Sequence, residues 1–358
     1  MRKSYIDKVY SIPVYTGDVS GACSALYELG GMVVIHDPSG CNSTYNTHDE
    51  TRWYDNPSQI YITGMNDIDA ITGDDERLIE QVVSAANELK PRFIAYAASP
   101  LPYLNGTDFA GIAKLTESRT GIPCFWVPTN AMHDYSKGAS EAFAAYARKF
   151  FPEGSGGNVK FCKDKVNIIG VTPLDFAGTV FKSGASIDGK EIVSCWAKDC
   201  TLEELARTPE AGVNIVASAS GLETAKYLEE ALGIPYRTGN RFYDVPRNKS
   251  NRFIIGDPVI SGCIAGYLKD IKDEDYTVVA TTEIAEELLQ DGDIHEVREQ
   301  YIRQILEDAE TIIADPLYRA ISPAGANFIE LPHFALSGRL YRKRIPDLTK
   351  PEEYLYGT

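Results

Sequence analysis

The pattern of apolar and polar positions in the first part of the chain alternates between strands and helices. Residues 32–35 form a short apolar run of the kind that becomes a buried strand. Residues 75–90 carry apolar side chains at helical spacing, and the proline that follows them favours a helix end. A second buried strand is expected at 93–98, a helix at 109–120 and a strand at 124–128. Strand, helix and strand in this order predict a parallel sheet with helices on its faces.

Further units follow after breaks in this pattern. Residues 151–165 contain a Gly-Ser-Gly-Gly run and are typical of a linker. A strand at 166–170 opens a second unit, and a strand at 252–257 opens a third, which includes a charged helix from about 295 to 307. We therefore expect an α/β protein of three Rossmann-like domains, with parallel sheets around a central cleft. The expected domains are residues 1–155, 156–250 and 251–358.

Composition limits the classes of partner. The 358 residues carry a net charge of −16, which repels phosphates, so no nucleic-acid partner is expected. No apolar run approaches the roughly 20 residues that span a bilayer, and the basic residues at the start have no apolar core behind them, so we expect neither a membrane anchor nor a secretory signal. The seven cysteines are an odd number spread over the chain, which is not a disulfide framework. We infer a cytoplasmic protein.

The candidate chemistry centres on the stretch from His36 to Tyr45. Its Pro-Ser-Gly-Cys turn follows a predicted strand, so Cys41 is expected at a strand's carboxyl end, the edge where α/β sheets bind ligands. Cys23 lies in the predicted helical segment before that strand, residues 22–28. Two thiols that reach one point suit a soft metal or an iron–sulfur cluster. The alternative is that Cys23 is a small core residue and Cys41 an incidental loop thiol.

Other motifs are weaker or missing. The chain has neither a Gly-x-Gly-x-x-Gly turn nor a Gly-x-x-x-x-Gly-Lys-Ser/Thr loop, so a nicotinamide or nucleoside triphosphate site is unsupported. Cys195 and Cys200 lack a second ligand pair at zinc-finger spacing. His36 and His48 flank Cys41, which raises the case for a functional role. The charged and aromatic run 48–54 reads as a solvated helix face rather than as a catalytic segment.

Several ordered segments resemble the component 1 family of nitrogenase and its relatives. Gly21-Ala22, followed by residues 36–41, resembles the family's Gly-Ala and His-Gly-Pro-x-Gly-Cys, whose cysteine is an iron–sulfur ligand. Residues 74–91 resemble a helix of the family, and 93–100 its Thr-Thr-Cys-Pro strand end. The remaining matches are 106–108, which resembles the Gly-Asp-Asp turn, and 166–170, 211–217, 227–230 and 233–236, which resemble the second domain.

The chain also departs from the family pattern. Gly17 stands where the family commonly has a first cysteine, and Ser99 replaces the cysteine of Thr-Thr-Cys-Pro. The cysteine that holds the iron–molybdenum cofactor of true nitrogenase would fall near Ser218, which has no sulfur, so nitrogen fixation is not expected. Cys41 is the cluster cysteine that remains, with Cys23 as a possible displaced replacement.

The resemblance implies an oxidoreductase component that takes electrons from a separate ATP-driven iron–sulfur reductase and passes them through a cluster to an unknown substrate. In that reading His36, His48 and His333 are the catalytic candidates. One alternative is a binding or scaffold protein that holds a metal cluster or tetrapyrrole for delivery. Another is a fold that has lost the cluster and binds a small molecule in its cleft.

The expected cofactor is a [4Fe-4S] cluster at a subunit interface, as the resemblance implies. Such a cluster needs four protein ligands. Cys23 and Cys41 supply two per chain, so we expect a homodimer or a heterodimer with a related subunit. Ser99 is a further candidate ligand, although a hydroxyl matches iron–sulfur chemistry less well than a thiolate. The remaining cysteines are assigned to packing: Cys124, Cys162, Cys195, Cys200 and Cys263.

Overall fold

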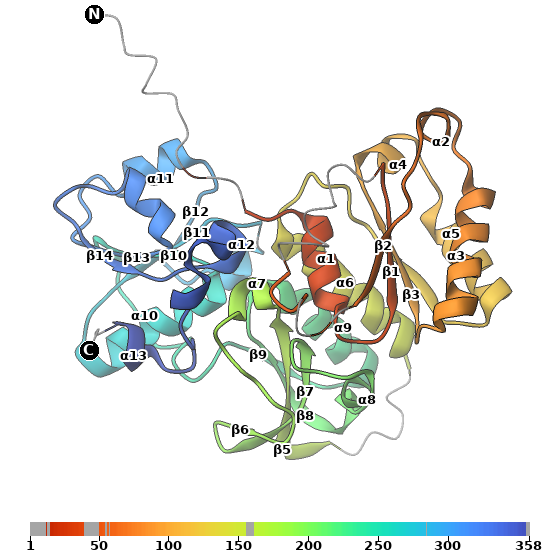
Figure 1. Cartoon of the computed structure of the whole chain (residues 1–358). Helices are drawn as coiled ribbons and strands as arrows, with labels where there is room; N and C mark the ends of the chain where they lie inside the picture. Colours follow the sequence, from red (N-terminus) through yellow and green to blue (C-terminus); the bar gives the residue numbers. More distant parts are fainter. Residues whose placement is uncertain are drawn as a thin grey trace, which may run out of the picture. The chain divides into compact units, whose positions relative to one another are not determined.

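The computed structural model describes residues 12, 15–38, 50–53, 56, 58–154, 161–283 and 285–355 (Figure 1). The chain divides into two compact units. One unit contains residues 16–238, and the other joins the described residues before 16 to those from 239 onward. The chain passes from one unit to the other after Tyr15 and again after Thr238.

The first sheet lies in the unit of residues 16–238 and has the strand order β2-β1-β3-β4, with every neighbouring pair parallel. Its central strands β1 and β3 are buried along almost their whole length, because helices cover both faces of the sheet. The strands are β1 (Met32–His36), β2 (Gln59–Ile62), β3 (Ile94–Ala98) and β4 (Cys124–Val127). The helices are α1 (Asp18–Leu26), α2 (Asp67–Thr72), α3 (Asp75–Leu89), α4 (Pro100–Leu104), α5 (Phe109–Thr120) and α6 (Tyr135–Phe150).

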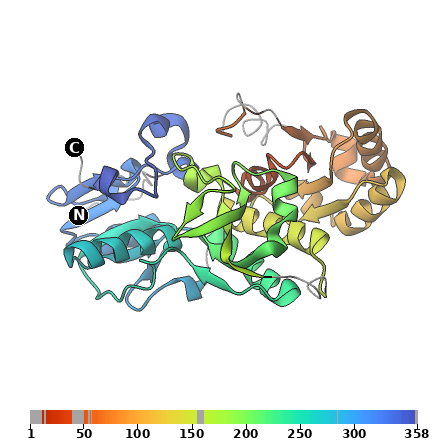
Figure 2. The same cartoon turned by 90° about the horizontal axis from the view of Figure 1, so that it is seen from below.

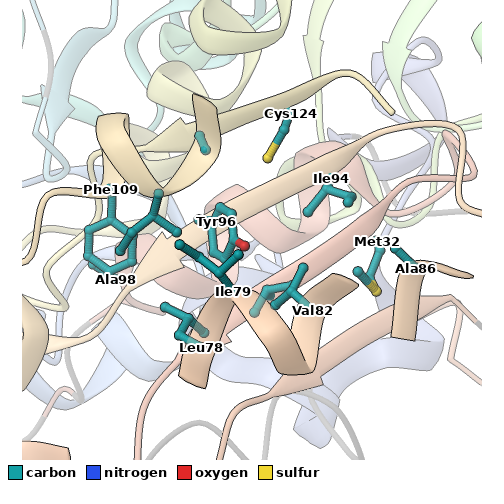
Figure 3. Packing of buried hydrophobic residues seen from close by; sticks show 13 residues of the cluster. Met32, Leu78, Ile79, Val82, Ala86, Ile94, Tyr96, Ala98, Phe109 and Cys124 are labelled. Carbon is teal, nitrogen blue, oxygen red and sulfur yellow. The ribbon is translucent and has the colours of Figure 1, made fainter. Parts of the chain in front are cut away.

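Helix α3 illustrates how the sequence pattern becomes a core (Figure 3). Its apolar residues recur at helical spacing and bury one stripe against β1 and β3, beside Tyr96 and Phe109. The Asp74 carboxylate accepts from the backbone N–H of Arg77 at the start of the helix. The buried stripe consists of Leu78, Ile79, Val82 and Ala86. The predicted helices at 75–90 and 109–120 are therefore confirmed.

The second sheet belongs to the same unit and has the order β6-β7-β5-β8-β9. All its pairs are parallel except β6 with β7, which form an antiparallel hairpin at one edge. The strands are β5 (Cys162–Val171), β6 (Ser186–Ile187), β7 (Lys190–Ala197), β8 (Ala211–Val216) and β9 (Tyr236–Thr238). The helices are α7 (Pro173–Phe176), α8 (Leu202–Ala206) and α9 (Leu222–Leu232), with 3₁₀ turns η3 (Thr208–Glu210) and η4 (Ala219–Gly221).

The third sheet forms the core of the other unit and is parallel throughout, in the order β12-β11-β10-β13-β14. The long helix α10 packs along this sheet (Figure 2). The strands are β10 (Arg252–Gly256), β11 (Thr277–Ala280), β12 (Ile294–His295), β13 (Thr311–Ala314) and β14 (Asn327–Glu330). The helices are α10 (Pro258–Lys272), α11 (Glu299–Ile305), α12 (Phe334–Ser337) and α13 (Pro351–Leu355), with 3₁₀ turns η5 (Glu286–Leu288), η6 (Pro316–Ile321) and η7 (Gly338–Arg344).

Helices α1 and α6 approach each other closely enough to join the first two sheets into one unit. A Cβ atom placed on Gly21 would lie 2.0 Å from the Tyr135 carbonyl oxygen, and one placed on Gly138 would lie 1.9 Å from that of Asp18. Only glycine fits at such contacts, because the obstacle is backbone and cannot rotate away. The sequence pattern did not reveal this packing.

The expected fold class, α/β with parallel sheets, is confirmed. Three element boundaries were wrong. Helix α1 begins at Asp18 instead of residue 22, and β5 begins at Cys162, inside the stretch expected to be linker. The charged helix expected from residue 295 is only α11, because Ile294 and His295 pair with β11 as strand β12. The domain boundaries remain predictions. No helix in the described ranges is long and apolar enough to cross a membrane.

Candidate functional site

The carboxyl edge of the first sheet gathers the polar residues that the sequence singled out. His36 is the last residue of β1 and pairs in register with Ala98, the last residue of β3. Ser99 follows directly, so the imidazole and the hydroxyl come from the ends of adjacent parallel strands. The hydroxyl of Thr129, just after β4, accepts from the Ala98 N–H at 2.8 Å and donates to the Ala98 carbonyl at 2.9 Å. These two bonds fix this edge. Ligands of open α/β sheets bind at such edges.

His36 is held as a neutral imidazole. Its Nδ1 lies 2.8 Å from the Thr63 hydroxyl, and its ring packs edge-on against Phe109. Burial lowers the pKa of His36 to about 4, although the nearby Asp69 and Asp37 carboxylates oppose that shift. At neutral pH the side chain can accept or donate a hydrogen bond without carrying charge.

A small recess opens beside His36. Asp69 and Arg77 form an ion pair at its wall, with Arg77 Nη1 at 2.9 and 3.2 Å from the two carboxylate oxygens. The recess combines an imidazole, carboxylates and a guanidinium, which suits a small polar molecule or water rather than an apolar ligand. Its lining residues are His36, Thr63, Met65, Asp69, Asp74, Arg77, Leu78 and Gln81.

Ser99 is completely buried, with 0% of its surface exposed. It occupies the N-cap position of α4, yet its hydroxyl makes no capping bond. Within the described structure that hydroxyl has no hydrogen-bond partner at all. Leaving a buried hydroxyl unsatisfied costs about 1–3 kcal/mol, so the position is poor for stability and suited to a group that would bind the oxygen.

The chain that leaves β1 is fixed before the cysteine turn begins. The Asp37 carbonyl accepts from the Met65 N–H at 3.0 Å, and the Asp37 N–H donates to the Thr63 hydroxyl at 3.3 Å. Residues 39–49 come next, and the predicted ligand Cys41 and the predicted catalytic residue His48 lie there, outside the described residues. Their predicted roles stay predictions.

The chain that follows Cys41 and His48 is fixed by a buried ion pair. Glu50 is 3% exposed and Arg52 is 9% exposed. Arg52 Nε and Nη2 donate to the two oxygens of Glu50 at 2.7 and 3.0 Å. The reading of this stretch as a solvated helix face is therefore wrong for Glu50 and Arg52, because their charges neutralise each other and both can be buried.

Cys23 lies on the buried side of α1, with 0% of its surface exposed. Burial and the nearby Glu50 carboxylate raise the pKa of the Cys23 thiol far above its ordinary value. This environment disfavours the thiolate that a metal requires. Within the described ranges no three His, Cys, Asp or Glu side chains stand close enough to hold a metal ion. These ranges alone therefore do not provide a cluster's donor set.

His333 belongs to the other compact unit, after β14. Its ring packs edge-on against Tyr15, with 5.6 Å between centroids, and its backbone N–H donates to the Asp315 carboxylate at 2.8 Å. The Tyr15 hydroxyl lies 2.8 Å from that of Thr281. His36 is the last residue of a parallel strand in the first sheet, whereas His333 comes three residues after a parallel strand of the third sheet. Its predicted catalytic role is untested.

The cysteines assigned to packing are free thiols. Cys124, Cys195 and Cys200 are buried, and Cys162 and Cys263 are partly exposed. Burial raises the pKa of Cys200 to about 12 and that of Cys195 well above its ordinary value. Such thiols are poor nucleophiles and poor ligands.

Sequence reasoning missed Asp18. Its carboxylate is 1% exposed and accepts from the backbone N–H groups of Val19, Asn130 and Ala131 at 2.7–2.9 Å. It therefore ties the start of α1 to the loop after β4. Burial raises the pKa of Asp18. The available signal was an acidic residue just before the Gly-Ala pair, which gave no hint of the loop more than a hundred residues away.

Comparison with known proteins fits this fold. A family model described as nitrogenase component 1 type oxidoreductase matches residues 18–253. The nitrogenase molybdenum-iron protein alpha chain of Azospirillum brasilense is 23% identical over 223 residues, which cover 58% of this chain and 46% of that protein. The nitrogenase iron-molybdenum cofactor biosynthesis protein NifN of Bradyrhizobium diazoefficiens is 22% identical over 247 residues, 62% of this chain and 52% of that protein.

Solved structures agree with the sequence matches. Two structures of nitrogenase Cp1, at pH 6.5 and pH 5, superpose with TM-scores of 0.64 and 0.65 at 14% identity. The superposition covers 95% of this chain and 89% of the pH 6.5 structure, and 96% of this chain and 87% of the pH 5 structure. This coverage supports the fold. The chain spans about half the length of the curated relatives it matches. Because the family model covers more than half of the sequence, the chain belongs to the nitrogenase component 1 type oxidoreductase family.

Proposed function

We propose that this chain is a cluster-holding component of a reductive enzyme, which accepts electrons from an ATP-driven reductase. The observation that carries the proposal is Ser99. Its buried hydroxyl has no partner within the described structure. Ser99 directly follows β3, which pairs with β1, and Cys41 comes after β1 in the sequence. A protein gains nothing in stability from such a group, so a bound ligand is the natural reason for it.

The first proposed ligand is Cys41, and the second is Ser99 or Cys23. Ser99 has the free hydroxyl, whereas Cys23 is buried next to Glu50, so the described environment favours Ser99 as the second ligand. A [4Fe-4S] cluster needs four protein ligands, which two such subunits would supply. The second subunit would be another copy of this chain or a related one. When bound, the cluster would supply one-electron transfer, and this chain would orient and bury it.

An exposed apolar surface supports the reductase partner. Helix α2 has six residues and buries none of them, and Ile68 and Ile71 are 71% and 83% exposed. Asn105, at the end of α4, donates to the Ala70 carbonyl at 2.6 Å and so ties the two short helices together. So short a helix is marginal in water, and apolar residues gathered on one face mark interaction sites. The exposed apolar residues of α2 and α4 are Ile68, Ile71, Leu101, Tyr103 and Leu104.

The charge around this surface indicates the chemistry of the partner. Asp67, Asp74, Asp75 and Asp108 are exposed near the two helices, whereas Glu76 is paired with Arg119. Burial and the charges of Asp108 and Asp74 raise the pKa of Asp75, so part of this acidic group is close together. A second copy would bring the same acidic residues to the contact. A reductase with apolar residues flanked by Lys and Arg fits better.

Iron and sulfide analysis of protein purified without oxygen tests the cluster. We expect iron, sulfide and broad visible absorption in the natural chain, and their loss in Cys41→Ser. Ser99→Ala should lose iron while the metal-free protein becomes no less stable, because an unsatisfied hydroxyl is removed. The matched control is Cys162→Ser, whose thiol is partly exposed. Full iron and sulfide content in Cys41→Ser would refute the proposed ligand.

The docking surface has its own test. Ile71→Asp and Leu104→Asp each add charge to the exposed apolar surface and should weaken binding of a purified ATP-driven iron–sulfur reductase, as measured by chemical cross-linking. Ile271→Asp, at an apolar residue that is 55% exposed on α10 in the other unit, is the control. Equal cross-linking of all these variants would remove this surface from the proposal.

The second candidate is a scaffold that assembles a cluster and delivers it. The similarity to a cofactor biosynthesis protein and the scarcity of cysteine ligands favour it. Turnover by the cluster-containing protein, with electrons from the reductase, would support the redox role. Transfer of iron to an acceptor apoprotein, without turnover, supports the scaffold.

A further inference from the structure

The segment 66–73, which contains α2, has no core of its own. None of its residues is buried. Met65, just before it, is 7% exposed and donates its N–H to the Asp37 carbonyl at 3.0 Å, and Asp74, just after it, caps α3. The segment therefore spans two fixed points. Because a helix of six residues is marginal in water, contacts outside the helix decide whether α2 stays in place.

Among the described residues, two hydrogen-bonded contacts tie α2 to its surroundings. Arg77 Nη1 donates to the two carboxylate oxygens of Asp69 at 2.9 and 3.2 Å. Asn105 Nδ2 donates to the Ala70 carbonyl at 2.6 Å. The Arg77 side chain is 49% exposed and the Asn105 contact also lies at the surface, so water competes for both. Both contacts can open without disturbing the buried core.

The chain bends at Gly73, where α2 ends. Gly73 has φ of 67° and ψ of 121°, a conformation that residues with a side chain rarely adopt. Apart from its chain neighbours, no atom of the described structure lies within 4 Å of the place where a Cβ would stand. The backbone at this position therefore has room to rotate, and such element-terminal residues serve as hinges.

The inner side of α2 forms part of the recess beside His36. Asp69 lines the recess, and its charge acts on the imidazole, where it opposes the effect of burial on the His36 pKa. The Thr63 hydroxyl already engages Nδ1 of His36 at 2.8 Å. The nitrogen left for an incoming molecule is therefore Nε2. A movement of α2 would change how easily a molecule reaches it.

We propose that residues 66–73 are a lid that controls the access of small polar molecules to His36, with the hydrogen bond between Asn105 and Ala70 as its latch. When the latch opens, the segment swings about Gly73 and widens the recess. The lid acts on His36 whether or not the chain holds a cluster.

Acylation of His36 by diethyl pyrocarbonate measures how often the lid is open. The reagent attacks neutral imidazoles. Burial lowers the pKa of His36 to about 4 and the ordinary value is about 6.5, so at about pH 7.5 the ring is neutral with the lid closed or open. The rate therefore reports access rather than protonation. Mass spectrometry of the two peptides compares His36 with His295, an exposed histidine of the other unit that serves as the reference.

The variant Asn105→Ala removes the latch without touching the recess, because Asn105 does not line it. We expect the rate at His36, relative to His295, to rise about two- to tenfold, the change in an equilibrium that the loss of one hydrogen bond typically produces. Asn105→Gln keeps an amide donor and should restore part of the protection. The matched control is Arg119→Met, which breaks an exposed pair with Glu76 and should leave the rate unchanged.

Hydrogen exchange shows where the structure loosens. In Asn105→Ala the amides of residues 66–73 should exchange faster, while those of α3 keep their rates. An unchanged acylation rate at His36 in Asn105→Ala would overturn the lid, and so would an equal rise in Arg119→Met. Faster exchange along the whole of α3 would show that Asn105 supports the fold and is not a latch, which would also overturn the proposal.

Discussion

The described part of each compact unit contains a buried bidentate arginine–carboxylate pair, and the two pairs differ in where they lie on their sheets. Arg52 and Glu50 meet at the carboxyl end of β7 and beside α1. Arg247 and Asp293 meet at the opposite end of the third sheet, where Arg247 bonds the carbonyl of Tyr276 just before β11. Both pairs are bidentate, with distances of 2.7–3.2 Å.

The surroundings of the second pair are those of a structural pin. Asp293 also accepts from the N–H groups of Val278 and Gln290, and Arg247 Nε donates to the Gln290 amide oxygen at 3.2 Å. The pair thus closes loops at the amino ends of the strands, away from the edge where α/β sheets bind ligands. Buried charge alone does not mark a functional site. The two pairs differ in which end of the strands they lie at.

The largest expected effect comes from breaking either pair on one side only. Arg52→Met and Arg247→Met each leave a buried carboxylate without its cation, and each should lower the free energy of unfolding by about 3–5 kcal/mol. Urea denaturation measures the loss, and hydrogen exchange should locate it in residues 16–238 for Arg52→Met and in residues 239–355 for Arg247→Met. A loss spread over both units in either variant would contradict the independence of the two networks.

A somewhat smaller effect is expected from filling the close backbone contacts of each unit. Gly138→Ala places a Cβ against the Asp18 carbonyl. Gly266 lies in α10, and Gly266→Ala places a Cβ 1.8 Å from the Phe242 carbonyl oxygen. Both should cost about 3 kcal/mol by overpacking, measured by thermal unfolding. Only Gly138→Ala should also reduce iron content, because it displaces α1. Equal iron loss in both variants would mean that the two units do not differ in this respect.

The pH dependence of stability should distinguish the first sheet's carboxyl edge. Burial lowers the pKa of His36 to about 4, so the unfolded chain binds a proton that the folded chain does not as pH falls from about 6.5 to 4. The contribution of His36 is fully present above that range and is lost through it, by about 3 kcal/mol. His36→Gln should flatten this part of the stability curve. A curve that keeps its slope would show that other groups cause it.

The smallest effect is expected from an exposed ion pair of the same chemistry. Arg119 donates to both oxygens of Glu76 at 2.7 and 3.0 Å, as tightly as either buried pair. Both side chains are well exposed, so water and salt screen the attraction. Arg119→Met should leave the urea midpoint unchanged within error. A clear drop would mean that geometry, rather than burial, sets the strength of these pairs.

Local sequence determined the elements whose signals are local. The apolar stripe of α3 and the proline that follows it predicted that helix to within a residue, and the buried runs at 32–35 and 93–98 predicted β1 and β3. The family resemblance also came from short ordered segments, and the matching family model confirms it. These signals suffice because helix caps, periodicity and strand ends depend on neighbours a few residues away.

Only the tertiary structure decided which charged residues are buried. By sequence, Glu50 and Arg52 belong to a polar run and resemble a solvated face, yet they pack against Ser24 and Ala197. In the same way only the tertiary structure shows that the Ser99 hydroxyl is buried and has no partner among the described residues. Burial and partner choice depend on residues that are distant in the chain, and the cost of burying a charge or a hydroxyl is set by those distant neighbours.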